Sequence, residues 1–149
     1  LTLLPYLDGE RTPNLPDANG LLAGLTRANA TPANLARAAV EGMLAGLADA
    51  VDALRAQRMP VRRILLIGGA AASAAVRAVA PALFGAPETV PSPAEYVALG
   101  AARQAAWVLR GGDEPPAWPV DGVDAAGAPT PAVRERYGDV RERARDLLS

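Results

Sequence analysis

The segment Arg63 to Gly69 is the feature that most limits what this chain can fold into. Its middle four residues are all apolar, and the pair Gly68-Gly69 follows them directly. A continuous apolar run, in place of an alternating one, is typical of a strand buried on both faces of a parallel sheet. A helical pattern then runs from Ser73 to about Phe84, with Pro81 placed to kink or end it. The order strand, glycine pair, helix predicts an α/β fold in which helices cover a sheet.

The longest expected element is a helix over Thr31 to Arg58. Thr31 is a good N-cap residue, and Pro32 suits the first helical position. Gly42 and Gly46 each cost about 1 kcal/mol relative to alanine inside a helix, so we expect another backbone to pack closely there. The apolar stripe predicted to face the core consists of Leu35, Ala39, Met43, Gly46, Ala50 and Leu54, widened by Val40, Leu44, Leu47 and Val51.

The remaining elements follow from short apolar runs and from the positions of glycine and proline. They are an extended segment or edge strand at Leu1 to Leu7, a loop at Asp8 to Gly20, a strand at Leu21 to Thr26 with a close backbone approach at Gly24, a short strand at Thr89 and Val90, and a helix at Pro93 to Arg110. The chain is predicted to divide into a folded unit (1–110), a linker rich in proline and glycine (111–131) and an amphipathic C-terminal helix (132–149).

Composition excludes several kinds of chemistry. The chain has no cysteine, histidine or lysine, and all fifteen basic residues are arginine. Thiol nucleophiles, disulfides, Ser-His-Asp catalysis and the usual zinc sites are therefore excluded. The net charge of −1 argues against a nucleic-acid partner, and no apolar run is long enough to cross a membrane. Because the chain begins at Leu1, we expect a fragment of a longer protein, with the cytoplasm as its default location.

The glycine pair allows two interpretations. A P-loop needs a lysine and a dinucleotide fingerprint needs GxGxxG, and this chain has neither. Glycines still let a backbone approach a ligand, and the start of the following helix offers free N–H groups, so the turn could bind a phosphate or ribose. It could equally be a tight turn in any α/β domain. The neighbouring Glu10 and Arg11, in a segment rich in turn residues, are interpreted as a structural loop.

Taken together, the segments resemble the C-terminal domain of the FGGY carbohydrate kinases, and within that family the xylulokinases. The resemblance covers nearly the whole chain except the linker. The stretches that carry it are LPYLDGERTP (4–13), GLLAGLTRANATPANLARAAVE (20–41), LIGGAAAS (66–73), YVALGAA (96–102) and the closing RERYGDVRERARDLL. The glycine loop departs from the family pattern, because Ala70 and Ala72 stand where a glycine and a cation are usual.

The resemblance implies an actin-like, ribonuclease H-like ATPase fold. It also implies transfer of the γ-phosphoryl group of ATP, with Mg²⁺, to a sugar, giving D-xylulose 5-phosphate from D-xylulose. By the same resemblance, nucleotide-binding residues would be Gly68, Gly69, Ala70 and Ser73. The catalytic aspartate of the family lies in the N-terminal part, so no catalytic or metal-binding residue is assigned to this chain.

The partners that the resemblance implies are ATP, a small sugar and the N-terminal kinase domain, and it leaves a homodimer open. Two alternatives remain at this point. One is a different FGGY kinase, acting on gluconate or a similar sugar. The other is a non-catalytic module that uses an actin-like fold for binding or oligomerisation.

Overall fold

The structure is a computed structural model that describes residues 1–12, 14–125 and 128–148. It is a mixed α/β chain, as expected, but its strands form two small sheets in place of the single sheet that was predicted. Its strands are β1 (Thr2–Leu4), β2 (Leu21–Ala23), β3 (Ile64–Leu65), β4 (Glu88–Pro91) and β5 (Gly122–Ala125). Its helices are α1 (Pro32–Ala56), α2 (Ala74–Val79), α3 (Pro81–Phe84), α4 (Tyr96–Arg110), α5 (Pro131–Arg143) and α6 (Arg145–Leu148), and a 3₁₀ turn, η1 (Gly69–Ala72), precedes α2.

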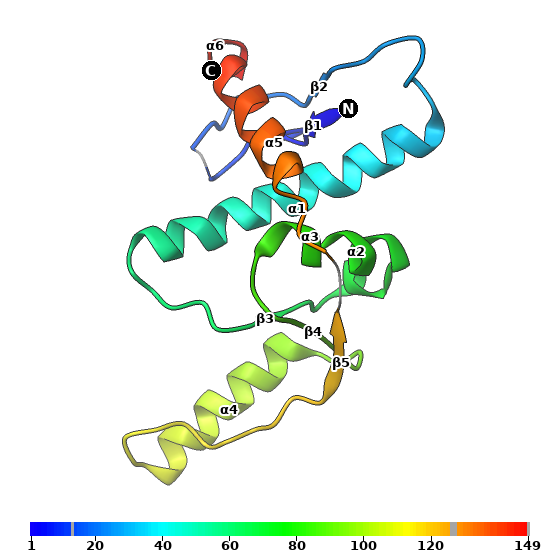
Figure 1. Cartoon of the computed structure of the whole chain (residues 1–149). Helices are drawn as coiled ribbons and strands as arrows, with labels where there is room; N and C mark the ends of the chain where they lie inside the picture. The colour runs from blue at the N-terminus through cyan, green and yellow to red at the C-terminus, as the bar shows by residue number, and fades with distance from the viewer. Residues whose placement is uncertain (13, 126–127, 149) are drawn as a thin grey trace.

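Helix α1 lies between two groups of elements (Figure 1). On one side are α5 and the antiparallel pair β1–β2, in which Leu3 faces Leu22. On the other side are α2, α3 and a second sheet with the strand order β3-β4-β5. In that sheet β3 and β4 are parallel, whereas β4 and β5 are antiparallel. The long helix therefore contributes to two separate cores.

The start of α1 forms as predicted. Thr31 has an extended backbone, and its hydroxyl accepts a hydrogen bond from the amide of Asn34 at 3.2 Å. Pro32 occupies the first turn, where its missing N–H costs nothing. At Gly42 the carbonyl oxygen of Leu3 would lie only 2.2 Å from an added Cβ, so a backbone does pack closely there. At Gly46 the nearest atom is the Tyr137 hydroxyl at 3.6 Å, which is ordinary van der Waals contact with a side chain.

The face that α1 buries agrees with the predicted one only in part, because the predicted Leu44 is buried and Val40 and Val51 pack against the core beside it. Its buried residues are Ala38, Gly42, Leu44, Ala45 and Ala48. Most of the predicted core stripe is instead exposed, including Leu35, Met43 and Leu54. The physical reason is the close approach of β1, which selects the side of the helix that carries glycine and alanine. The predicted approach at Gly24 is also wrong, because nothing lies within 4 Å there and the glycine instead accommodates a φ of +77°.

Other differences are local. Pro81 separates α2 from α3, as the sequence indicated. The predicted linker contains β5, which pairs with β4 through partners such as Thr89 and Asp124. The Thr89 hydroxyl also hydrogen-bonds the Asp124 carboxylate at 3.1 Å. The sequence did not predict a strand in a segment so rich in proline and glycine. The strand forms because it pairs with β4, whose residues are distant in sequence.

The C-terminal helix predicted at 132–149 forms as α5 and α6 up to Leu148, whereas Ser149 lies outside the described residues, and α5 packs on α1. Tyr137 is buried, and its hydroxyl lies 3.2 Å from that of Tyr6. The Arg134 guanidinium donates to the carbonyl of Ala45 at 2.7 Å and to the carboxylates of Asp49 and Asp52 at 2.6 and 2.9 Å. Burial by itself would lower the pKa of Arg134. The hydrogen bonds and charges of the two aspartates together outweigh that effect, so the net shift of the pKa is upward.

Strand β4 begins with a buried carboxyl group. The Glu88 side chain is 3% exposed, and within the described residues neither of its carboxylate oxygens has a hydrogen-bond partner. Burial disfavours the ionised form and raises the pKa of Glu88 from 4.5 to about 7. The protein therefore carries a group that is easier to ionise in the unfolded chain than in the folded one.

Replacing Gly42 with Ala is expected to destabilise the fold by roughly 1–3 kcal/mol, because the new Cβ collides with the backbone of β1. Gly46→Ala is the matched control. It removes a glycine from the same helix without a clash, so it should be neutral or stabilising by up to about 1 kcal/mol. Thermal unfolding of both variants checks this. A Gly42→Ala variant as stable as Gly46→Ala would contradict the packing described here.

Glu88→Gln is expected to flatten the pH dependence of stability. Between pH 4.5 and about 7 the unfolded chain loses the Glu88 proton while the folded chain keeps it, so wild-type stability falls by roughly 3 kcal/mol as the pH rises. Below that window and above it, this group adds no further slope. Urea unfolding from pH 4.5 to 8 should show a variant whose advantage over wild type grows through the window. A constant difference between the two proteins would exclude the effect.

Candidate functional site

The predicted glycine turn follows β3 after two further residues, Leu66 and Ile67. The amide of Leu66 still pairs with the carbonyl of Thr89 at 3.0 Å, and the chain leaves the sheet at Gly68. Gly68 has a φ of +86°, a conformation that side chains rarely adopt. The turn η1 follows, and α2 begins only after Ser73. The sequence predicted a helix from Ser73, and the structure adds a 3₁₀ turn before it.

The turn presents free backbone. A Cβ added to Gly68 or Gly69 would meet nothing within 4 Å, so neither glycine is required by internal packing. The backbone of Gly69 does not have a positive φ, so its conformation does not require glycine either. Gly69 and Ala70 open η1, and the first N–H groups of a helix have no acceptor within that helix. The turn therefore offers accessible amide donors and no side chain beyond a methyl group.

A cleft of about 610 Å³ borders this turn. Because β3 and β4 are parallel, their carboxyl ends meet at one edge of the sheet, where open α/β sheets usually bind ligands. The lining residues come from the glycine turn and the residue before it, from α2, from the end of β4, and from the following segment up to the first residue of α4. They are Ile67, Gly68, Gly69, Ala71, Ala72, Arg77, Val90, Pro91, Pro93, Ala94, Glu95 and Tyr96. Of the predicted site residues, Gly68 and Gly69 line the cleft, whereas Ala70 on the turn and Ser73 directly after it lie outside the lining.

Sequence reasoning missed Arg77 and Glu95. The Arg77 guanidinium donates to the carbonyl of Ala71 at 3.3 Å, so it holds the turn while it lines the cleft. Arg77 lies one helical turn beyond Ser73, and this spacing was the only signal that could have placed it near the turn. Glu95 adds a carboxylate from the far wall. The cleft thus combines backbone donors, one cation and one anion.

A larger hollow of about 750 Å³ lies elsewhere, between the N-terminal loop, α1 and α5. Its charged lining residues are three arginines and three acidic residues: Arg134, Arg141, Arg145, Asp49, Asp52 and Glu142. These charges pair with one another; Arg134 and Arg141, for example, both bind Asp49. Because these positive and negative side chains pair with one another, they hold α5 against α1. Little unpaired charge is left to attract a charged ligand. The residues around this hollow therefore have a structural role, which is to connect α5 to α1.

The Glu10 loop is structural, as interpreted from the sequence. The Glu10 carboxylate accepts hydrogen bonds from the amides of Arg11 and Thr12 at 2.7 and 3.0 Å. Gly9 has a φ of +79°, and an added Cβ would lie 2.3 Å from the Pro16 carbonyl oxygen. The loop is thus clamped by its own backbone.

Among residues 1–12, 14–125 and 128–148, no three or more acidic side chains form a group that could hold a metal ion. None of the helices in these residues is long and apolar enough to cross a membrane.

Known proteins with a similar sequence and structure show which family this chain belongs to. Residues 1–109 match the FGGY family of carbohydrate kinases, C-terminal domain. A xylulose kinase from Streptomyces rubiginosus is 43% identical over 150 aligned positions, which cover 100% of this chain and 31% of that protein. The crystal structure of xylulose kinase from Bifidobacterium adolescentis has a TM-score of 0.81 and 53% identity, over 94% of this chain and 28% of that one. The crystal structure of gluconate kinase from Lactobacillus acidophilus has a TM-score of 0.71 and 28% identity, over 100% of this chain and 31% of that one.

These matches first define a class, an α/β domain with the actin-like ATPase fold found in sugar kinases. Since the family match covers well over half of the residues, the chain belongs to the FGGY family of carbohydrate kinases and corresponds to its C-terminal domain. The chain spans about a third of the length of the relatives named above.

Proposed function

We propose that this chain is the nucleotide-binding part of a kinase that transfers the γ-phosphoryl group of ATP to D-xylulose, giving D-xylulose 5-phosphate. The observation that carries the proposal is the open glycine turn at the carboxyl edge of two parallel strands, beside a cleft. The similarity to proteins named xylulose kinases supports the choice of sugar. The cytoplasm is the location that we expect for such an enzyme.

The residues of the turn suit a nucleotide phosphate. In the proposed complex the phosphates lie against Gly68 and Gly69, where no Cβ blocks approach, and the free amides of Gly69 and Ala70 point to them. Ser73 would contact the nucleotide from the end of the turn. Arg77 would supply the positive charge that the turn itself lacks.

The role of this half is positioning. ATP supplies the group that is transferred, and phosphoryl transfer depends mainly on alignment and charge stabilisation. Because the described residues contain no metal-binding cluster, Mg²⁺ would be bound by the phosphates and by groups of the remaining polypeptide. The base and the sugar site would also come from that polypeptide. We therefore expect no xylulose-dependent activity from the 149-residue chain alone.

One assay tests both sides of this proposal, with the kinase-length polypeptide that contains this chain. ADP formation is measured with ATP, Mg²⁺ and either D-xylulose or gluconate, and the 149-residue chain is run beside it. We expect turnover on xylulose by the longer protein and none by the chain. Turnover on gluconate instead would support the second candidate, which the gluconate kinase likeness favours. Comparable activity of the isolated chain would overturn the division of labour.

The same assay tests the turn through Gly69→Val. The new side chain has open space in the fold but would occupy the phosphate position, so the KM for ATP should rise at least tenfold with little change for the sugar. Gly138→Val on α5 is the control, because it also enters open space but lies far from the cleft. An unchanged KM for ATP in Gly69→Val would remove the turn from the nucleotide site.

A further inference from the structure

Glu88 is a buried acidic residue that has no part in the proposed reaction. It is the first residue of β4, and within the described residues neither of its carboxylate oxygens has a hydrogen-bond partner. Buried polar groups in proteins are nearly always hydrogen-bonded, so this exception needs a physical explanation. A neutral carboxyl group tolerates such a place far better than a carboxylate, because burial penalises the charge. The surroundings of Glu88 therefore favour the protonated group.

The register of the sheet shows what lies beside this carboxyl group. Glu88 is opposite Ile64 of β3 on one side and Ala125 of β5 on the other. Because side chains alternate along a strand, Glu88 shares a face of the sheet with Val90. Ile64 and Val90 both pack against the apolar core that α1, α2 and α3 contribute to. Glu88 thus lies on the core face of the sheet, with a strand on each side.

The two neighbouring strands bring no charge to this face. Arg63, just before β3, is on the opposite face by the same alternation and lines the hollow beside α4. Asp124 of β5 is also on the opposite face, where its carboxylate accepts the hydrogen bond from the Thr89 hydroxyl. Neither residue can therefore compensate the charge of an ionised Glu88.

The helices that contribute to this core have their charged groups bound elsewhere. At the end of α1, Arg55 donates to two backbone carbonyls and to Asp52. Arg77 of α2 donates to a carbonyl of the glycine turn, and Arg134 of α5 pairs with acidic side chains of α1. Helix α3 has no charged residue. Accordingly, burial alone raises the pKa of Glu88 to about 7, with no contribution from a neighbouring charge.

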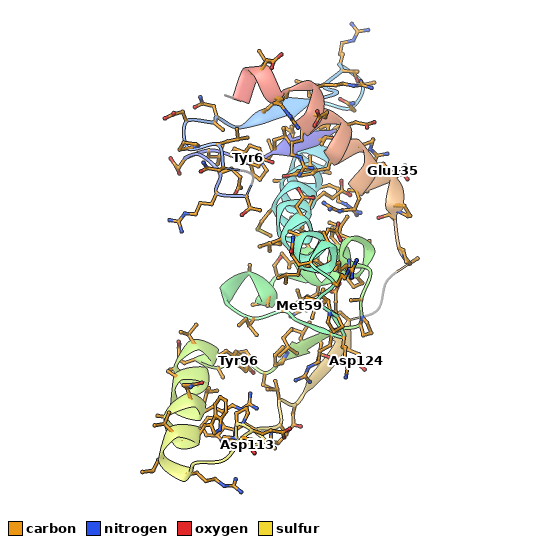
Figure 2. All side chains as sticks on the ribbon, turned by 90° about the vertical axis from the view of Figure 1, so that its left-hand side faces the viewer. Tyr6, Met59, Tyr96, Asp113, Asp124 and Glu135 are labelled. Carbon is orange, nitrogen blue, oxygen red and sulfur yellow. The ribbon has the colours of Figure 1, made fainter. Side chains whose placement is uncertain are left out.

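Of the two strands beside Glu88, β5 is the one that can move away at less cost. It is an edge strand of four residues, three of which are exposed, and none of the four belongs to an apolar core. All four line a hollow of about 520 Å³ beside α2, which gives the strand and water room. Figure 1 shows β5 at the outer edge of its sheet, and Asp124 marks the strand in Figure 2. Strand β3, in contrast, packs against the core through Ile64.

We propose that Glu88 is a proton-dependent latch for β5. While the carboxyl group is neutral, β5 stays paired with β4 and covers it; when the group ionises, β5 separates from β4 and water reaches the carboxylate. Val90 and Pro91, which line the cleft beside the glycine turn, lose their partners Val123 and Gly122 in the same step. Loss of the proton therefore loosens one wall of that cleft, whatever ligand the cleft binds.

The direction of the pH effect follows from the two states of β5. With β5 open, the hydrated carboxyl group ionises near its ordinary pKa of 4.5, whereas under β5 its pKa is about 7. Between these two values the open form has lost a proton that the closed form keeps, so opening becomes easier as the pH rises. Below 4.5 and above about 7 both forms carry the same charge, and opening no longer depends on pH.

Hydrogen exchange of the kinase-length polypeptide, followed by mass spectrometry from pH 5 to 8, tests the latch. Protection is expressed relative to the exchange rate of an unfolded peptide at the same pH. The protection of the β5 amides should fall roughly tenfold or more between pH 5 and 7, and little above pH 7. The amides of Ile64 and Leu66, which bond to Pro87 and Thr89, should stay protected throughout. Protection of β5 that does not change with pH, or an equal loss at Ile64 and Leu66, would overturn the proposal.

Glu88→Met removes the ionisable group and keeps a side chain of similar length against the apolar core. Protection of β5 in this variant should be equal at pH 5 and 7. Asp124→Asn is the matched control, because it removes a carboxylate from the other face of the same sheet; it should keep the pH dependence of the wild type. Should Glu88→Met not fold, Glu88→Gln replaces it, with the pH dependence as the readout. A fall in β5 protection with pH in the Glu88 variant would contradict the latch.

Opening β5 by a different route gives an independent test. A Cβ added to Gly122 would lie 2.7 Å from the carbonyl oxygen of Val90, so Gly122→Ala should force β5 from β4 at any pH. Its β5 amides should be weakly protected already at pH 5, with no further loss by pH 7. Gly138→Ala, whose Cβ meets nothing within 4 Å, should behave as the wild type. Undiminished, pH-dependent protection of β5 in Gly122→Ala would show that this pairing does not cover Glu88, and the proposal would be wrong.

Discussion

The parallel pairing of β3 with β4 is the constraint on which the rest of this structure depends. Two backbone hydrogen bonds, from Ile64 to Pro87 and from Leu66 to Thr89, set the register. Because the strands run the same way, the chain leaves both at one edge of the sheet. That edge carries the glycine turn on one side and the entry to α4 on the other, and the cleft lies between them. A different register would move the turn away from the residues that complete the site.

The long helix α1 connects this pair to the rest of the chain. Through Leu44 and Ala48 it covers the core next to β3, and through Gly42 it approaches the backbone of β1. The ion pairs of Arg134 with Asp49 and Asp52 then hold α5 against the same helix. Part of this network is exposed, so each pair adds only modest stability, and the buried contact between Tyr6 and Tyr137 fixes the position of α5 more firmly.

Local signals in the sequence predicted the elements and the turn well. Each correct prediction depends on residues close together in sequence: the cap at Thr31, the break at Pro81 and the glycine pair. What was missed depends on a distant partner for β5 and on an unpredicted local 3₁₀ turn for Arg77. Strand β5 exists because β4 pairs with it, and Arg77 joins the cleft because a 3₁₀ turn brings Ala71 within reach.

The packed face of α1 was mistaken for a related reason. Its large apolar residues suggested a core, but within the described residues the face with glycine and alanine packs closest. Leu35, Met43 and Leu54 remain exposed within the described residues.

We propose that the glycine turn, with Arg77 beside it, binds the phosphates of a nucleotide. The most direct measurement is a titration of the ¹⁵N-labelled 149-residue chain with ADP and Mg²⁺, followed by NMR. We expect the largest amide shifts at Gly68, Gly69 and Ala70, with smaller ones at Arg77. Shifts centred on Arg134 and Arg141, or no shifts at millimolar ADP, would contradict it.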